Sequence, residues 1–227
     1  MNGNNLQRWG KALIVTLVLF VIYAGYLYVR RESWSLSNFN KSFASTAVLL
    51  AGFTLLIRPL SARIAFFYRF MTIRRQLCLL AFVLGAIHIV ISLFFIPTRF
   101  TLAWYQQEWV GVVFGVVAIL VWIYLAFISR NQQIIALGSD RWQRLQSTLG
   151  RIAFFLVYLH LIHLKYSGWV TWFTTGENKS SFLANPQYIQ ESFLVFIVMT
   201  VIILIKLIQI IRGGGDKHGN NTVKQIA

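Results

Sequence analysis

Residues 139–165 read S-D-R-W-Q-R-L-Q-S-T-L-G-R-I-A-F-F-L-V-Y-L-H-L-I-H-L-K, and the interpretation of the whole chain starts from them. The stretch begins with charged and amide side chains and turns apolar at Leu149, as expected of a helix that enters a membrane from water. Close to its far end it carries two histidines, His160 and His163. An ionisable side chain inside a bilayer is costly, so a histidine at that depth indicates a functional site.

The composition of the chain is that of a membrane protein. Of its 227 residues, 57% are hydrophobic and only 12% are charged, which exceeds the apolar fraction usual for a soluble domain. The single cysteine, Cys78, excludes an intrachain disulfide and a cysteine-ligated metal cluster. The net charge of +15 does not indicate a nucleic-acid partner, because the basic residues lie in clusters between apolar runs.

Six apolar runs are predicted to cross the bilayer as helices. They lie at residues 12–29, 43–57, 77–96, 109–128, 149–164 and 193–211. We therefore predict an all-α membrane protein, a six-transmembrane-helix bundle. Pro59 is expected to stop the second helix. The glycines that begin at Gly213 are expected to end the sixth, followed by a disordered polar tail over residues 213–227.

Basic residues are distributed unevenly between the two sides of such a bundle. Six spans place both termini on one side, which holds 15 of the 21 Lys and Arg residues, while the other side holds 6. This bias predicts cytoplasmic termini and a multi-pass protein of the cell's inner (plasma) membrane. The longest outer connection, residues 166–190, is expected to be either a loop with aromatic anchors or an amphipathic segment at the interface.

His88 is the one other histidine in an apolar run, and it matches His160 in depth. Thirteen residues separate it from Arg75 at the edge of its span, and thirteen separate His160 from Ser147. At ~1.5 Å per residue, each stands roughly 20 Å along its helix, in the outer half of a hydrocarbon core about 30 Å thick. The two spans run in the same direction, so both imidazoles can bind one haem iron from opposite faces.

Other roles for these histidines stay open at this point. A histidine in a membrane also hydrogen-bonds across helices as a purely structural group. His163 lies one turn beyond His160 and points about 60° away from it. It would hydrogen-bond a haem propionate, face the outer interface, or replace His160 as the ligand.

Two stretches resemble the ferric reductase-like transmembrane family. Residues 74–77, R-R-Q-L, lead into L-G-A-I-H-I-V-I-S-L-F-F, which resembles the family's third helix. The stretch L-G-S-D-R-W-Q-R-L-Q-S-T-L-G-R-I-A-F-F-L-V-Y-L-H resembles its linker and fifth helix, especially in the MsrQ-type haem-binding membrane subunits. The resemblance covers residues 43–164 within a predicted domain of residues 1–212. It implies a haem b whose axial ligands are His88 and His160.

The sequence departs from this family at a second pair of positions. Members with two stacked haems carry another histidine on each helix, about 13 residues or roughly 20 Å nearer the cytoplasm. Here those positions hold Arg74 or Arg75 on one helix and Gln146 or Ser147 on the other. The resemblance therefore implies one haem, close to the outer face.

The predicted function is haem-based electron transfer from a quinol, a flavin or a separate reductase to an acceptor on the outer side, such as a redox partner protein. The flavin domain of the larger reductases is not expected after residue 211. The alternative is a non-redox membrane protein, a transporter or an assembly subunit, with a structural histidine pair. A further hypothesis is that basic linker residues bind the phosphate of FMN or lipid head groups: Arg63, Arg69, Arg74 and Arg75.

Overall fold

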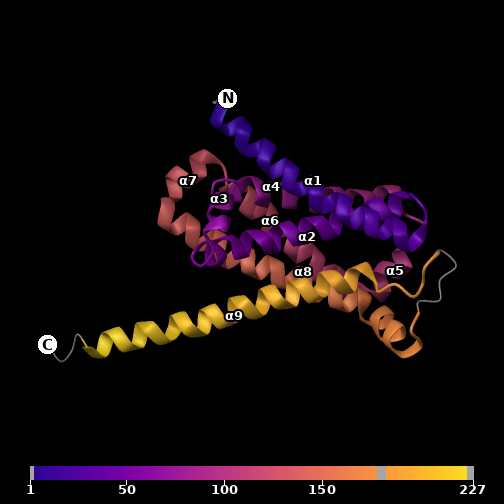
Figure 1. Cartoon of the computed structure of the whole chain (residues 1–227). Coiled ribbons are helices and arrows are strands. Elements are labelled where there is room, and N and C mark those ends of the chain that lie inside the picture. The colour runs from indigo at the N-terminus through magenta and orange to yellow at the C-terminus, as the bar shows by residue number, and fades with distance from the viewer. Residues whose placement is uncertain (1–2, 178–182, 224–227) are drawn as a thin grey trace.

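The computed structural model describes residues 3–177 and 183–223, with side chains described over 5–177 and 183–211, and six of its helices are long and apolar enough to cross a membrane (Figure 1). This confirms the predicted all-α class and the six spans. The six helices are α1 (Gly3–Arg31), α2 (Leu36–Ser61), α4 (Arg74–Val90), α6 (Trp109–Ile128), α8 (Ser139–Thr175) and α9 (Glu191–Val223). The short elements are η1 (Ala65–Phe67), α3 (Tyr68–Met71), the π-helical η2 (Ile91–Phe95), α5 (Leu102–Gln107) and α7 (Asn131–Leu137).

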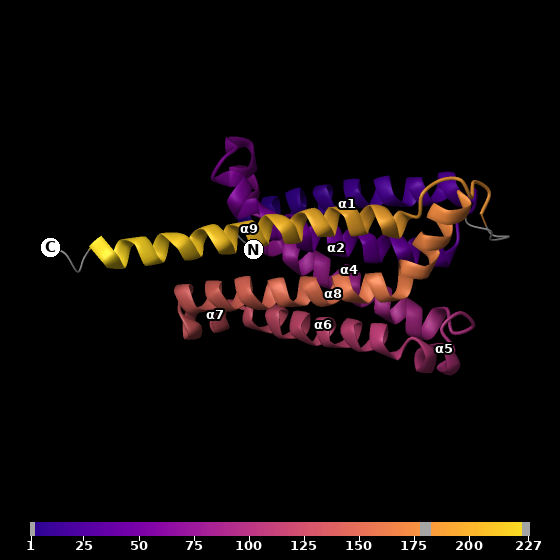
Figure 2. The same cartoon turned by 90° about the horizontal axis from the view of Figure 1, so that it is seen from below.

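The bundle has two distinct ends, which are named here for what lies at each. The terminal end holds the start of α1, the end of α9, the α2–α4 connection and α7 (Figures 1 and 2). The loop end holds the α1–α2 turn, α5 and the α8–α9 connection (Figure 2). Because the long helices alternate in direction, α4 and α8 both run from the terminal end to the loop end.

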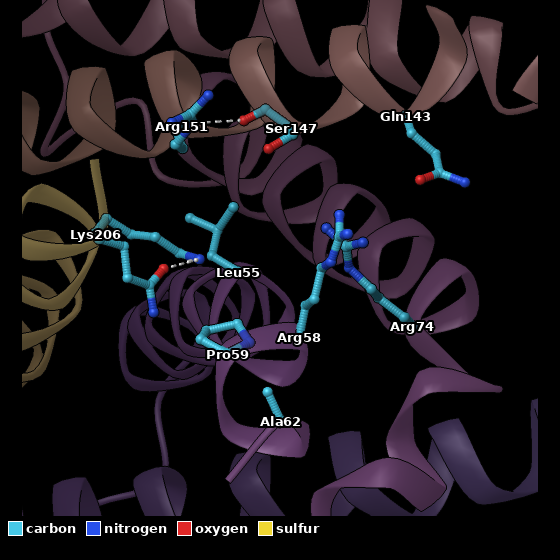
Figure 3. A pocket seen from close by; sticks show the side chains of 10 residues that line it. Leu55, Arg58, Pro59, Ala62, Arg74, Gln143, Ser147, Arg151 and Lys206 are labelled. Carbon is cyan, nitrogen blue, oxygen red and sulfur yellow. Dashed lines mark hydrogen bonds between the residues drawn. The ribbon is translucent and has the colours of Figure 1, made fainter. Parts of the chain in front are cut away.

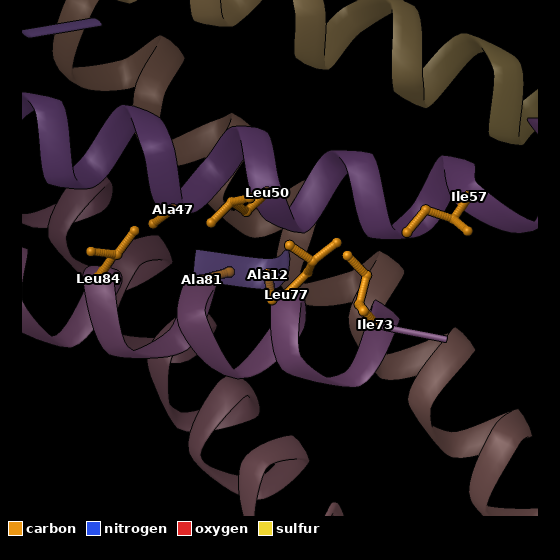
Figure 4. Packing of buried hydrophobic residues seen from close by; sticks show 8 residues of the cluster. All are labelled: Ala12, Ala47, Leu50, Ile57, Ile73, Leu77, Ala81 and Leu84. Atoms are coloured by element: carbon orange, nitrogen blue, oxygen red, sulfur yellow. The ribbon is translucent and has the colours of Figure 1, made fainter. Parts of the chain in front are cut away.

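Helix α2 occupies the centre and joins two packed groups. It packs against α4 and α1 through a cluster of small and branched residues, shown in Figure 4: Ala12, Ala47, Leu50, Ile57, Ile73, Leu77, Ala81 and Leu84. A second cluster joins α2 to α8 and α9 through Leu55, Phe154, Val195, Met199 and Ile202. Gly52 lies where α2 meets this second group, since an added Cβ would stand 2.5 Å from Ile202 Cδ1. Small residues allow such close helix contacts in membranes.

The outer surface of the bundle is apolar. Large hydrophobic side chains on α1, α6 and α9 are about half exposed, among them Leu17, Leu120 and Leu204. Exposed apolar surface on this scale is unfavourable in water and favourable against lipid tails. The same six helices therefore fit a bilayer environment, as their sequences predict.

Two predicted helix ends are wrong. Pro59 lies inside α2, which continues to Ser61. It sits in the last turn, where the loss of one backbone hydrogen bond disturbs few residues. Helix α9 is assigned through the glycines at 213–215 to Val223. Glycine lowers helix propensity by about 1 kcal/mol per residue but does not forbid a helix.

Helix α8 is also longer than its apolar core. It runs without a break for 37 residues from Ser139, whereas the apolar run begins only at Leu149. At its far end it includes residues 166–175, which were expected to be a loop or an interfacial segment. Trp169 is buried there, and its Nε1 group donates to Ser192 Oγ at 3.0 Å. The helix ends at Gly176, whose φ of 74° is left-handed and suits glycine.

Candidate functional site

His88 lies on α4 and is held by a residue of α2. Its Nδ1 atom is 3.1 Å from the Asn40 backbone oxygen and 2.9 Å from Asn40 Oδ1. Asn40 is buried, and its Nδ2 group donates to Ser92 Oγ at 2.9 Å, which directs Oδ1 toward the imidazole. Both neighbours of Nδ1 are acceptors. Nδ1 therefore carries the ring proton, and Nε2 keeps its lone pair.

His160, on α8, has a matching arrangement with α6. Its Nδ1 atom donates to the Gly111 carbonyl oxygen at 2.7 Å. Gly111 and Gly115 stand one turn apart on α6, and a Cβ added to Gly115 would lie 2.9 Å from His160 Nδ1. These glycines let the imidazole rest against the α6 backbone. His160 is thereby fixed in the same tautomer as His88, with Nε2 unprotonated.

The two imidazoles lie on helices that both run from the terminal end to the loop end, an arrangement compatible with one shared site. Among the described residues, α4 and α8 do not pack closely on one another, whereas α4 packs on α2 and α8 packs on α6. Both side chains are half-buried, so each adjoins space that a solvent-sized group can enter. Among residues 5–177 and 183–211, neither His88 Nε2 nor His160 Nε2 has a hydrogen-bond partner.

This donor set fits the axial ligands of a haem better than a compact metal site. Over residues 5–177 and 183–211, no group of three or more His, Cys, Asp or Glu side chains is placed to hold a metal ion. A haem iron needs only two ligands from the protein, because the porphyrin supplies the others. Histidines that bind metals usually donate their second ring N–H to a carbonyl or carboxylate oxygen. His88 and His160 both do so.

His163 follows His160 by one turn but has different surroundings. Its side chain is 37% exposed, and its Nε2 atom lies 3.5 Å from Glu108 Oε2, just before α6. The ring also lies beside Gly111, where an added Cβ would stand 2.8 Å from His163 Cδ2. Which of the three predicted roles His163 takes, at a haem propionate, at the outer interface or as a haem ligand, stays a prediction for experiment.

Nearer the terminal end, α4 and α8 carry Arg74 and Gln146 where a second ligand pair would stand. Gln146 Nε2 donates to Leu125 O on α6 at 3.1 Å and to Oγ of Ser129, the residue that follows α6, at 2.8 Å. Arg74 Nε donates to Thr54 O on α2 at 3.0 Å. These side chains connect neighbouring helices, and neither offers a haem ligand.

A basic cavity of about 330 Å³ opens at the terminal end between α2, α4, α8 and α9 (Figure 3). We call it the terminal-end cavity. Four helices each contribute one cation to its lining: Arg58, Arg74, Arg151 and Lys206. No Asp or Glu is among the described residues that line it, and its other polar groups are Gln143, Ser147 and Gln209. Its chemistry suits a phosphate or another oxyanion.

The terminal-end cavity differs from the basic cluster predicted for FMN or lipid. Of the four arginines named for that role, only Arg74 lines it. Arg69 instead lies over the Phe66 ring at 4.1 Å, and Arg75 Nη1 donates to Asn131 Oδ1 at 2.8 Å. One signal for this cavity is present in the sequence. Lys206 lies inside an apolar span, where a cation requires a partner or a polar cavity.

Comparison with known proteins adds no family or relative: no family model matches the chain, and no curated protein matches its sequence.

Proposed function

We propose that this chain is a membrane electron-transfer protein of the ferric reductase-like type that holds one haem b between His88 and His160. One observation carries the proposal: each imidazole donates Nδ1–H to an oxygen of a neighbouring helix and keeps Nε2 available for a metal. The haem supplies the reversible one-electron chemistry. His88 and His160 hold it, while Asn40 and the Gly111 carbonyl set the orientation of the two rings.

Two axial histidines favour electron transfer over oxygen chemistry. Because His88 and His160 would both serve as ligands, the protein would hold a bound haem for electron transfer and not for the binding of a small molecule. The role of the protein is therefore to fix the position of the haem and its potential rather than to bind a substrate at iron.

A single haem per chain is the expected stoichiometry. Arg74 and Gln146 stand at the inner ligand positions, and their polar groups are engaged by α2 and α6. Neither guanidinium nor amide replaces imidazole as a haem ligand. Electrons then have to cross roughly 20 Å of helix between the terminal end and the histidine pair. A membrane quinol, a bound flavin or a separate reductase would supply them.

The uneven distribution of basic residues supports a cytoplasmic terminal end and an outward-facing loop end in the inner (plasma) membrane. The histidine pair would then lie nearer the outer side, where a haem held by it could serve an acceptor such as a redox partner protein. A reporter fused after Ala227 is expected to be active only in the cytoplasm. Activity only outside the membrane would contradict this orientation.

FMN is a second cofactor that one observation supports. The terminal-end cavity places four cations around about 330 Å³ with no carboxylate among the described lining residues. A flavin phosphate or a lipid phosphate would neutralise them. On the proposed orientation, a flavin at this position would face the cytoplasm and lie on the route of electrons toward the haem.

The visible spectrum of the purified, dithionite-reduced protein tests the proposal. We expect the sharp bands of a reduced b-type haem and about one haem per chain in a pyridine haemochrome assay. Two haems per chain would contradict the assignment of Arg74 and Gln146 to the positions of a missing second ligand pair. A protein that is colourless even after haem supplementation would instead favour the non-redox alternative, in which the two histidines only connect helices.

A further inference from the structure

A second basic cavity, of about 280 Å³, lies at the loop end, and we call it the loop-end cavity. Five cations and one acid line it: Arg30, Arg31, Lys41, Arg99, Lys165 and Glu191. They come from the end of α1, the start of α2, the segment after η2, α8 and the start of α9. Residues far apart in the sequence thus bring an excess of positive charge to one place.

Glu191 neutralises only part of this charge. Its side chain is buried, and its two oxygens are both in use: Oε2 is 3.0 Å from Arg30 Nη1, and Oε1 is 3.1 Å from Lys41 Nζ. Over the described residues, Arg31, Arg99 and Lys165 have no carboxylate within ion-pair distance. Water can satisfy the hydrogen bonds of three such cations, but it leaves their mutual repulsion in place.

Buried donors point to the same conclusion. Nη2 of Arg30 and Nε of Arg31 are buried and have no hydrogen-bond partner among the residues that the structure describes. Arg30 as a whole is only 3% exposed. A charged donor held away from water without an acceptor is unfavourable. Arg30 and Arg31 therefore keep hydrogen-bonding capacity that the described residues leave unused.

The loop-end cavity lies on the loop-end side of the histidine pair. Lys41 follows Asn40, the residue that accepts the hydrogen bond from His88. Lys165 lies five residues after His160, about 7.5 Å further along α8 toward the loop end. Leu164, which lines the cavity, lies four residues after His160 on the same helix. A ligand in this cavity would therefore lie on the loop-end side of the histidines.

We propose that the loop-end cavity binds a ligand that presents two oxyanion groups of the carboxylate type. Guanidinium groups bind carboxylates through two parallel hydrogen bonds, and an ammonium group adds a compact charge. Such a ligand has two sources. One is the pair of haem propionates, and that source rests on the proposed function. The other is a free dicarboxylate from the aqueous side, which requires no haem.

The first experiment uses the full-length protein without haem, in detergent, with succinate as the probe. Succinate is expected to bind in calorimetry and to raise the melting temperature of the protein. Uncharged succinamide and sodium chloride of equal ionic strength are expected to do neither. Arg31→Gln with Lys165→Gln should weaken succinate binding about tenfold or more, because each removes a charge-assisted contact. Each single substitution should weaken succinate binding less than the double substitution does. If the double variant does not fold, the two single variants are measured in its place. Arg141→Gln, an exposed cation outside this cavity, is the matched control.

The second experiment repeats these measurements on the haem-loaded protein and separates the two sources. If the propionates fill the cavity, haem blocks succinate, and the double variant loses haem faster or shifts its potential. If a free dicarboxylate fills it, succinate binds in the presence of haem, and haem retention is unchanged. The first experiment needs no haem, so succinate binding can be measured even if the protein binds no haem. Failure of the proposed function is therefore distinguishable from failure of this inference. Absence of succinate binding together with unchanged haem retention in the double variant would overturn the inference.

Discussion

Helices α4 and α8 carry polar side chains at two levels, and the two levels use their hydrogen bonds differently. Near the loop end, His88 and His160 each hydrogen-bond a neighbouring helix through Nδ1, and Nε2 is left without a partner among the described residues. Near the terminal end, Arg74 and Gln146 are engaged by α2 and α6 and provide no metal ligand. The same two helices thus hold a candidate cofactor site at one level and ordinary connections between helices at the other.

The difference teaches how a polar residue in a membrane bundle should be interpreted. Buried polarity alone does not separate the levels, because all four side chains are polar and all four have partners. The two levels differ in whether an unpaired acceptor atom remains. When Nδ1–H of an imidazole is hydrogen-bonded, its Nε2 atom still carries a lone pair, and such a lone pair can bind a metal.

The largest expected effect comes from removing either ligand at the loop-end level. His88→Ala or His160→Ala should lose most of the bound haem or leave a five-coordinate, high-spin spectrum, because one axial bond is gone. Imidazole added to the solution should partly restore the low-spin spectrum. His163→Ala is the matched control, and it should keep a six-coordinate, low-spin haem. If His163→Ala loses that spectrum while His160→Ala keeps it, the axial pair is His88 and His163.

A smaller effect is expected from Asn40→Leu, which removes the side-chain acceptor of His88 Nδ1–H. The Asn40 backbone oxygen remains 3.1 Å away, so part of the orientation survives. Haem affinity should fall about tenfold, at the lower end of the range for such outer partners of metal ligands, and the midpoint potential should shift. Competition with apomyoglobin and a redox titration measure the two quantities. An unchanged potential and affinity would show that Asn40 does not tune the site.

The smallest effect should come from Gln146→Leu at the terminal-end level. The variant loses two hydrogen bonds to α6, while Ser129 keeps its own bond to the Leu125 carbonyl. Stability in detergent should fall by about 0.5–1 kcal/mol, with the haem content and spectrum unchanged. Loss of haem in Gln146→Leu but not in Asn40→Leu would reverse the comparison between the two levels.

Much of the fold could be predicted because hydropathy runs report directly on helices in lipid. The six long helices match the six predicted spans. The choice of His88 and His160 rested on their depth together with the resemblance to the ferric reductase-like family, and it stays a prediction. The ends of the helices were harder to predict. A helix continues into polar sequence as long as its backbone hydrogen bonds are satisfied, so Ser139 and Thr175 lie well outside the apolar run of α8.

The partners of the histidines could not be predicted in the same way. Which carbonyl faces His160 depends on how α6 and α8 pack, and a single sequence does not specify that register. A weak signal was present, because Gly111 and Gly115 form a small-residue pair of the kind that brings helices together. Asn40, a buried amide near a predicted span, was a second signal of this kind. The loop-end cavity had none, since its cations meet only after the chain has folded.

The central claim is that His88 and His160 together ligate one haem, and electron paramagnetic resonance of the oxidised wild-type protein tests it most directly. We predict the signal of a low-spin ferric haem with two imidazole ligands, whose integrated intensity corresponds to about one haem per chain. A high-spin signal as the main species would contradict the account. So would a haem-supplemented protein that gives no haem signal at all.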